Sequence, residues 1–297
     1  MSNRPTHLIL TIVMAWAMAA APDAAAQPVR ATAVKRIAAL EASAGGRIGV
    51  AALDTGTGLR LEHRATERFA MCSTFKLILA AAVLARVDAH KESLDRRVPI
   101  KTSDLLDYAP VTRRHLKEGS MTVGALCAAA VEESDNTAAN LLLRELGGPE
   151  VLTRFARSLG DSVTRLDRNE PSLNDNEPGD PRDTTSPAAM LETMRRLLLG
   201  DALSQSARNR LESWLVACTT GKERLRAGLP PSWRVGDKTG TGANGAANDV
   251  AILWPPNRAP VLVVVYCSGS TKSYKDLYAV IADVGGIVSN EFAGGAR

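Results

Sequence analysis

Hydrophobic and polar positions alternate near both ends of the chain, whereas the middle has helical spacing. Residues 48–53 and 59–63 alternate on either side of a turn at 54–58, which predicts a β-hairpin. Towards the other end, alternating or β-branched stretches separated by Gly- and Pro-containing turns predict three more strands, at residues 232–240, 247–254 and 261–268. We therefore expect strands to open the folded chain and to return near its end.

The stretch from Ser73 to Ala89 is rich in Ala and Leu and contains no Gly or Pro, which predicts a buried helix. Apolar residues at helical spacing, several after a Ser or Thr suited to an N-cap, predict further helices at residues 122–131, 134–146, 150–159, 186–199 and 204–216. A last apolar helix is predicted at residues 274–284. The middle of the chain is thus expected to be helical.

Strands at both ends with helices between them predict an α+β fold of the three-layer α/β/α type. An antiparallel sheet built from both chain ends would be flanked by helices, with an all-helical lobe inserted and the active site between the two. The sheet lobe would comprise about residues 27–65 and 217–297, and the helical lobe about residues 66–216.

Residues 168–183 fit neither pattern, because these 16 residues include three Pro, one Gly and five acidic residues. They predict a long loop, and loops of this length in compact domains are usually functional or disordered. Arg168 and Asp183 stand at its two ends, where an ion pair between them would close the loop.

The first 26 residues are predicted to be a cleaved secretory signal peptide. Arg4 is the only charged residue before an apolar run from Leu8 to Ala21, and Ala24 to Ala26 supply the small residues that a signal peptidase reads. The run of 14 residues is shorter than the roughly 20 needed to cross a bilayer. We expect residues 27–297 to be a periplasmic protein, free of the membrane after cleavage, and a monomer.

Composition and charge exclude several classes of function. The composition is that of an ordinary globular protein, and the formal net charge of +4 comes from scattered residues, so no nucleic-acid partner is expected. No His of the mature chain lies within a few residues of a Cys or a second His, so we expect neither a metal nor another cofactor. The four Cys are too widely spread for a small disulfide-stapled fold: Cys72, Cys127, Cys218 and Cys267.

Ser73 and Lys76 lie at the start of the predicted buried helix, three residues apart and therefore on one face. Burial between Phe75 and Leu77 would lower the pKa of Lys76 and let it act as a base toward the Ser73 hydroxyl. Backbone N–H groups at a helix start favour a developing oxyanion. Taken alone, the pair is weak evidence, because Ser-x-x-Lys should occur by chance about once in a chain of this length, and the alternative is a helix cap followed by a lysine that reaches solvent.

Three further groups of residues suit catalysis. Ser134 and Asn136 at a helix start supply a hydroxyl and an amide, although Ser and Asp there are most often N-caps. Lys238 to Thr241 end a strand, where backbone groups and a cation suit a peptide-like carboxylate substrate; the alternative is an edge strand with a protective Lys. Glu170 with Asn174 suits activation of a water molecule, although acidic loop residues are mostly solvated.

These residues together resemble the class A serine β-lactamases, which carry Ser-x-x-Lys, Ser-Asp-Asn and Lys-Thr-Gly motifs in this order. Here the motifs stand at residues 73–76, 134–136 and 238–240, and the resemblance covers nearly the whole mature chain, including residues 68–76, 108–112, 134–142, 182–185 and 240–242. It implies hydrolysis of the β-lactam ring of penicillins and cephalosporins through a serine acyl-enzyme, and so antibiotic resistance, with no cofactor and a small-molecule substrate as partner.

The resemblance also implies catalytic roles. Ser73 would be the acylated nucleophile, with its own N–H and that of Thr241 forming the oxyanion hole. Glu170 and Asn174 would position and activate the deacylating water. Either Lys76 or Glu170 would take the acylation proton, an alternative that is left open.

Ser134 would pass a proton to the lactam nitrogen, and the remaining residues would bind substrate. Asn136 would hold the side-chain amide of the drug and Tyr108 would wall the cleft. The substrate carboxylate would face Lys238, Thr239, Gly240 and Thr241.

Three departures from the family pattern change the expectations. Many members bridge the helix of the nucleophile to the one carrying Cys127, but Ala80 stands at the partner position. Others link the Cys before the nucleophile to a Cys at the place of Gly242, so all four thiols are expected to be free. Many members bind the substrate carboxylate with an Arg at the position that is Ala247 here. The resemblance therefore assigns that role to Arg224, and Arg226 is expected to matter much less.

Two other functions fit the same motifs. A penicillin-sensitive D,D-peptidase shares the chemistry, and a drug-binding sensor domain would be acylated and stay acylated. Both lack a fast deacylating water, so the Glu170 loop argues against each. Sustained turnover of nitrocefin would indicate a hydrolase, whereas a single equivalent of colour would indicate a binder.

Overall fold

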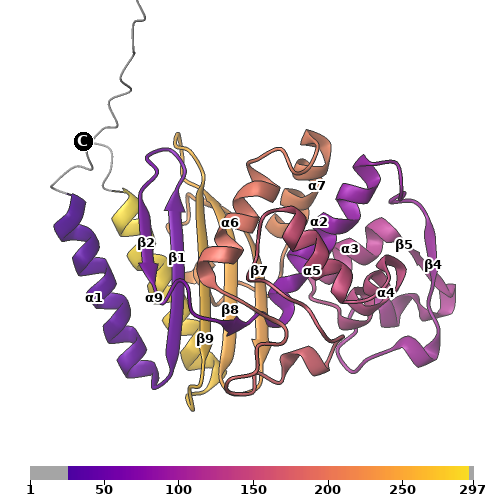
Figure 1. Cartoon of the computed structure of the whole chain (residues 1–297), viewed down its shortest axis with the longest axis horizontal. Coiled ribbons are helices and arrows are strands. Elements are labelled where there is room, and N and C mark those ends of the chain that lie inside the picture. Colours follow the sequence, from indigo (N-terminus) through magenta and orange to yellow (C-terminus); the bar gives the residue numbers. More distant parts are fainter. Residues whose placement is uncertain (1–25, 294–297) are drawn as a thin grey trace, which may run out of the picture.

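A five-stranded antiparallel sheet forms the centre of the protein, whose computed structural model describes residues 26–293 (Figure 1). Its strand order is β2-β1-β9-β8-β7, so strands from both ends of the chain lie side by side. The strands are β1 (Arg47–Asp54), β2 (Arg60–His63), β7 (Arg234–Gly242), β8 (Ala246–Trp254) and β9 (Val261–Ser268). The predicted hairpin and the return of the chain to the same sheet are confirmed.

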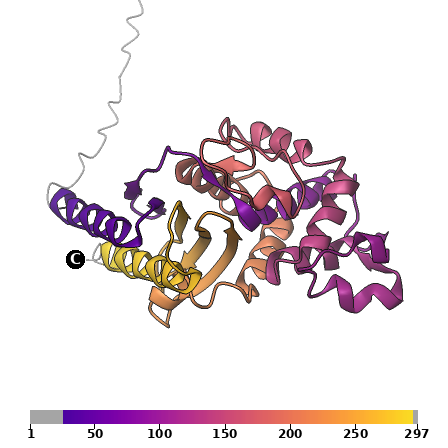
Figure 2. The same cartoon turned by 90° about the horizontal axis from the view of Figure 1, so that it is seen from below.

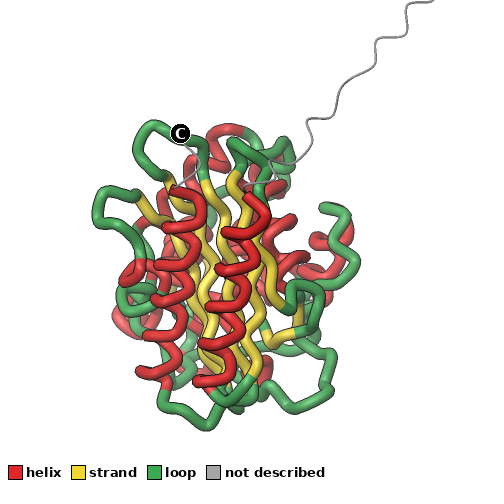
Figure 3. The backbone as a smooth tube through the Cα atoms, turned by 90° about the vertical axis from the view of Figure 1, so that its left-hand side faces the viewer, coloured by secondary structure: helices red, strands yellow, loops and turns green. Residues whose placement is uncertain are grey.

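The middle of the sheet is buried on both faces, since every residue of β9 and all but the last residue of β8 are buried. Along β9, Val263 and Val265 face one hydrophobic core, while Leu262 and Val264 face the other. Helices α1 (Ala26–Ala44) and α9 (Tyr274–Ala293) lie side by side over the first face (Figures 2 and 3). α6 (Pro187–Leu198) packs on the second face against β1 and β9. The three-layer α/β/α fold class is thereby confirmed.

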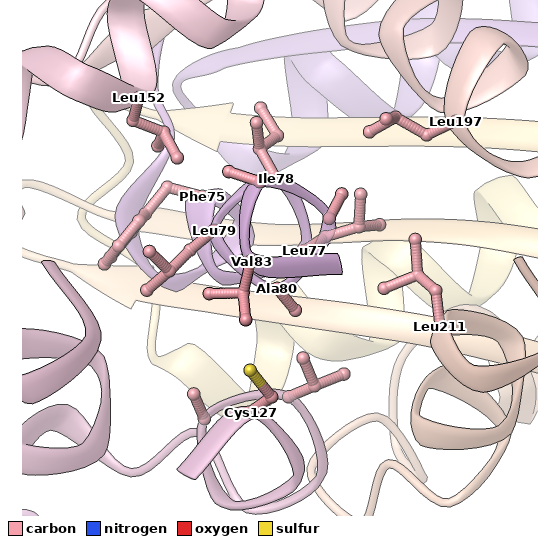
Figure 4. Close-up of a cluster of buried hydrophobic side chains, with 14 of the residues drawn as sticks. Phe75, Leu77, Ile78, Leu79, Ala80, Val83, Cys127, Leu152, Leu197 and Leu211 are labelled. Atoms are coloured by element: carbon pink, nitrogen blue, oxygen red, sulfur yellow. The ribbon is translucent and has the colours of Figure 1, made fainter. Parts of the chain in front are cut away.

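The helices between the strands lie where their patterns predict them. They are α2 (Phe75–Asp88), α3 (Val123–Glu132), α4 (Asn136–Leu146), α5 (Glu150–Ser158), α6 and α7 (Gln205–Val216). α2 is surrounded by apolar side chains from its neighbours, among them Leu152, Leu197 and Leu211 (Figure 4). A helix buried on all sides is held rigidly, and α2 carries Lys76 in its first turn.

Several short elements escaped the hydrophobic pattern. They are the strand pairs β3 (Phe69–Ala70) with β6 (Thr184–Thr185) and β4 (Arg97–Pro99) with β5 (Ser120–Thr122), the helix α8 (Leu225–Gly228), and the 3₁₀ turns η1 (Cys72–Thr74), η2 (Thr102–Asp104), η3 (Thr112–Glu118) and η4 (Ser172–Asn174). Elements of two to seven residues are too short for a periodicity to be recognised.

Two predictions at the ends of the chain were wrong. The folded chain opens with helix α1 rather than with a strand, because Ala33 and Ile37, four residues apart, are enough to seat an Ala-rich helix on the sheet. α9 ends at Ala293 instead of Val284. Gly285 predicts a helix end, but it lies in close backbone contact with α8, where a Cβ atom would come within 2.8 Å of the Leu225 carbonyl oxygen.

The predicted signal peptide lies, up to residue 25, outside the described residues. Within residues 26–293, no helix has both the length and the apolar character needed to span a membrane.

Candidate active site

A hollow of about 410 Å³ lies where β7 meets the helical part of the chain. The motif residues that are far apart in the sequence line this single cleft: Ser73, Tyr108, Ser134, Asn136, Asn174, Arg224, Thr239, Gly240 and Thr241, together with Thr220 and Tyr278. Lys76, Glu170 and Lys238 lie buried beneath it. A larger hollow of about 600 Å³ between α1, α8 and α9 contains none of these residues, so volume alone does not identify the site.

Ser73 lies in the turn η1, just before α2 begins. The preceding residue, Cys72, has a φ of 45°, a left-handed conformation that is unfavourable for a residue with a Cβ atom. Asn248 helps to hold this turn, because its Nδ2 donates to the carbonyl oxygens of Ala70 and Met71 at 2.9 and 3.0 Å. Ser73, the predicted nucleophile, therefore lies on a backbone turn that is held by a side chain of β8.

Lys76 is the centre of the buried network. Its Nζ lies 2.9 Å from Ser73 Oγ, 2.5 Å from Asn136 Oδ1 and 3.0 Å from Glu170 Oε1. Burial lowers the pKa of the Lys76 ammonium, although the carboxylate of Glu170 opposes this shift. A lysine that gives up its proton more readily than usual, next to a serine hydroxyl, is suited to act as a base.

Glu170 approaches Ser73 from the other side. Its Oε1 accepts a hydrogen bond from Ser73 Oγ at 3.3 Å, and its Oε2 accepts one from Asn174 Nδ2 at 2.5 Å. Asn140 on α4 clamps the Glu170 backbone, donating from Nδ2 to the carbonyl at 2.9 Å and accepting from the N–H at 3.0 Å. Sequence reasoning assigned Asn140 no role, although its spacing of four residues from Asn136 places both on one helix face.

The long loop that carries Glu170 is closed as predicted. Arg168 Nε donates to Asp183 Oδ2 at 2.6 Å, and the buried Asp183 also accepts from the Arg168 N–H at 2.9 Å. The pair therefore brings the two ends of the loop together.

Ser134 faces the cleft because its neighbour performs the capping. Asp135 is the N-cap of α4, and its side chain accepts from the Ala138 N–H at 2.8 Å. The Ser134 hydroxyl is left to accept from Lys238 Nζ at 3.1 Å. Burial lowers the pKa of Lys238 to about 8.

The end of β7 runs close to the nucleophile turn, and only glycine permits this approach. A Cβ atom at Gly240 would lie 2.8 Å from the Met71 carbonyl oxygen. The next residue, Thr241, is exposed to the cleft, whereas Ala247, paired with it on β8, is buried in the core. Ala247 therefore presents no side chain to the cleft.

Arg224, immediately before α8, is buried and reaches the cleft from the side. Its Nη1 donates to the carbonyl oxygens of Gly240 at 2.7 Å and Asn248 at 2.5 Å, and its Nη2 donates to Thr241 Oγ1 at 2.7 Å. The guanidinium group thus lies beside Thr241, where a cation is expected. Tyr108, half exposed, also lines the cleft.

Arg226, which was expected to matter much less for the substrate carboxylate, does not line the cleft but pairs with a buried aspartate. Its Nε donates to Asp237 Oδ1 at 2.5 Å, and the Asp237 carboxylate is completely buried. Burial raises the pKa of Asp237, and the Arg226 guanidinium opposes that shift. The two arginines stand two residues apart but bond to different positions along β7, Arg224 to Thr241 near its end and Arg226 to Asp237 four residues earlier, which the sequence alone does not distinguish.

All four cysteines are free and buried in the described structure. A Cβ atom at Gly242 would lie 2.6 Å from Cys72 Sγ, and Cys127 points toward the side of α2 that carries Ala80 (Figure 4). Among residues 26–293, no three His, Cys, Asp or Glu side chains are grouped as metal ligands.

Residues 32–292 match the sequence profile described as the β-lactamase enzyme family. Beta-lactamase CTX-M-8 of Citrobacter amalonaticus is 49% identical over 87% of this chain and 88% of its own. Beta-lactamase L2 of Stenotrophomonas maltophilia is 50% identical over 91% and 90%. A solved structure of the class A β-lactamase of the last common ancestor of Gram-negative bacteria matches with a TM-score of 0.87 and 60% identity. The match covers 88% of this chain and 99% of that one.

A serine hydroxyl within hydrogen-bond distance of both a buried lysine and a loop carboxylate is the arrangement expected of a serine hydrolase that forms an acyl-enzyme. This chain belongs to the β-lactamase enzyme family, and within it to the class A β-lactamases.

Proposed function

We propose that this chain hydrolyses the β-lactam ring of penicillins and cephalosporins through an acyl-enzyme on Ser73, and so confers antibiotic resistance. One observation carries the proposal: the Ser73 hydroxyl lies between Lys76 Nζ at 2.9 Å and Glu170 Oε1 at 3.3 Å. A base for acylation and a carboxylate for deacylation therefore both lie within hydrogen-bond distance of the same oxygen atom.

In acylation, Ser73 Oγ attacks the lactam carbonyl while its proton passes to the neutral amine of Lys76 or to Glu170. The backbone N–H groups of Ser73 and Thr241 are assigned to the developing oxyanion, in keeping with the close approach of β7 to the nucleophile turn. The C–N bond then breaks, and the nitrogen takes a proton from Ser134, which lies within 3.4 Å of Lys76 and 3.1 Å of Lys238.

In deacylation, Glu170 removes a proton from a water molecule, which attacks the ester carbonyl. Asn174 donates to Glu170 and helps to hold that water, while Asn140 fixes the backbone of the loop. The C–O bond breaks, Ser73 recovers its proton, and the ring-opened acid leaves. A site without this carboxylate would stop at the acyl-enzyme.

Substrate binding is assigned to both walls of the cleft. Asn136 is proposed to hold the side-chain amide of the drug, and Tyr108 to cover it. The substrate carboxylate would lie against Arg224 and the hydroxyl groups of Thr239 and Thr241, with Lys238 behind them.

We further propose that residues 1–26 direct export and are removed, and that residues 27–297 act as a periplasmic monomer with a sheet lobe (27–65 and 217–297) and a helical lobe (66–216). The apolar run from Leu8 to Ala21 and the small residues before Gln27 support the export signal.

The test compares the parental chain with Ser73→Ala and Glu170→Ala. The parental protein should turn over nitrocefin continuously, and Glu170→Ala should accumulate a penicillin adduct on Ser73 that intact mass spectrometry detects. Ser73→Ala should form no adduct. One equivalent of colour from the parental protein would identify a D,D-peptidase-like or sensor-like binder, and parental turnover by Glu170→Ala without an adduct would refute the role of Glu170.

A further inference from the structure

Two tyrosines on the first turns of α9 contact the end of the cleft that we propose binds the substrate carboxylate. Tyr274 Oη donates to the carbonyl oxygen of Gly242 at 2.6 Å, where β7 ends. The ring of Tyr278 lies under the Arg224 guanidinium, with Arg224 Cζ 4.1 Å from the ring centre. Sequence reasoning treated this helix only as a closing element of the fold, so neither tyrosine was assigned to the site.

Arg224 needs support on its flat face. Its hydrogen bonds to Gly240, Asn248 and Thr241 all leave from the edge of the guanidinium plane. They fix the two terminal nitrogens, while the ring of Tyr278 covers one face of the plane. An arginine side chain has many rotamers to lose, so a face contact that removes alternative rotamers pre-organises the cation.

Tyr278 also lines the cleft itself, and its hydroxyl lies 3.5 Å from Thr241 Oγ1. That distance is too long for a strong hydrogen bond, so the ring contact is the stronger of the two interactions. α9 packs closely on α8, because Gly228 and Gly285 let the two backbones meet. The helix that carries Tyr278 is thus rigidly joined to the segment that carries Arg224.

We propose that Tyr278 is a positioning residue that holds Arg224 in the orientation needed to bind the carboxylate of the substrate. The inference rests on the proposed function, since it assigns a partner to the proposed carboxylate-binding cation. Tyr278 acts through Arg224 and by its ring, not by its hydroxyl. Its removal should therefore matter only for substrates that carry a carboxylate, and only while Arg224 is present.

The experiment measures the second-order rate constant for acylation of Ser73 by a penicillin and by the methyl ester of the same penicillin. A hydrolase and a protein that stays acylated both undergo this acylation step. The measurement therefore tests the inference even if the protein does not turn over its substrate. Tyr278→Leu should lower the rate for the free acid roughly 2- to 30-fold and leave the rate for the ester unchanged. Tyr278→Phe should stay within about twofold of the parental protein for both.

The dependence on Arg224 is tested by a double-mutant cycle. In an Arg224→Ala background, Tyr278→Leu should cause no further loss. Trp254→Leu is the matched control, because Trp254 forms an equivalent contact with Arg234, 4.0 Å from the ring centre, at the far end of β7. It should not change the ratio of the acid and ester rates.

Three results would overturn the proposal. An equal loss for acid and ester with Tyr278→Leu would mean that the ring only shapes the fold. A loss that persists in full without Arg224 would mean that Tyr278 acts on something else. A Tyr278→Phe variant as slow as Tyr278→Leu would assign the effect to the hydroxyl.

Discussion

The nucleophile half of the cleft contains Ser73, Lys76 and Glu170, which are all buried and hydrogen bonded to one another. The other half, which we propose binds the substrate carboxylate, is organised differently. There Lys238 bonds to Ser134 while Arg224 bonds to Thr241, and Thr241 is exposed. In the first half each group is positioned by hydrogen bonds to the other two. The second half instead has two cations on separate elements. Loss of one group should therefore be severe in the first half and graded in the second.

Lys76→Ala should have the largest effect, because it removes the amine beside Ser73 and leaves the Glu170 carboxylate without its buried partner. General-base catalysis contributes typically 10²- to 10⁴-fold, so acylation by a penicillin should slow by roughly that factor. Stopped-flow acylation kinetics measure it, with circular dichroism as the check of folding. A variant that keeps more than about a tenth of the parental rate would show that the first half tolerates loss as the second does.

Arg226→Ala should lower stability rather than specificity. It leaves the buried Asp237 carboxylate without its ion-pair partner, and because Arg226 is itself partly exposed we expect a loss of about 2–4 kcal/mol in the free energy of unfolding. Urea denaturation measures it. An unfolding free energy within about 0.5 kcal/mol of the parental value would mean that the pair contributes little.

Arg224→Ala should act on the substrate instead. A charge-assisted hydrogen bond is worth about 1.5–3 kcal/mol, so kcat/KM for a penicillin should fall roughly 10- to 150-fold. Lys222→Ala, an exposed residue on the same segment, is the control and should change kcat/KM less than twofold. Equal small losses would leave the carboxylate to Lys238 and the two threonine hydroxyls.

The smallest effect should be a dependence on pH. Lys238, with a pKa of about 8, is charged below pH 8 and neutral above it, while the substrate carboxylate stays ionised. Binding should weaken as the pH rises, so kcat/KM should fall up to about tenfold between pH 7 and pH 9, with Arg224 retaining part of the attraction. A penicillin methyl ester has no carboxylate to bind Lys238, so it separates this change from titration of Lys76. An identical fall in kcat/KM for the ester would rule out Lys238 as the cause.

The sequence by itself predicted the class of fold, which the structure confirms, and supplied the residues that we propose to be catalytic. Strands at both ends, helices between them and three spaced motifs indicate this fold and a serine acyl-enzyme site. Ala80, Gly242 and Ala247 likewise indicated which family features this chain lacks, because a missing side chain is visible in the sequence. Strong periodicity and chemically specific motifs are local properties, and they can be recognised locally.

Only the tertiary structure decided how neighbouring residues divide their tasks. Arg224 and Arg226 are alike in sequence, yet one reaches Thr241 and the other a buried aspartate four residues earlier on β7, because Arg224 precedes α8 whereas Arg226 lies within it. Tyr278 lies 54 residues beyond Arg224, and nothing local connects them until α9 packs on α8. Such contacts depend on where separate elements meet, which hydrophobic patterning along one chain does not encode.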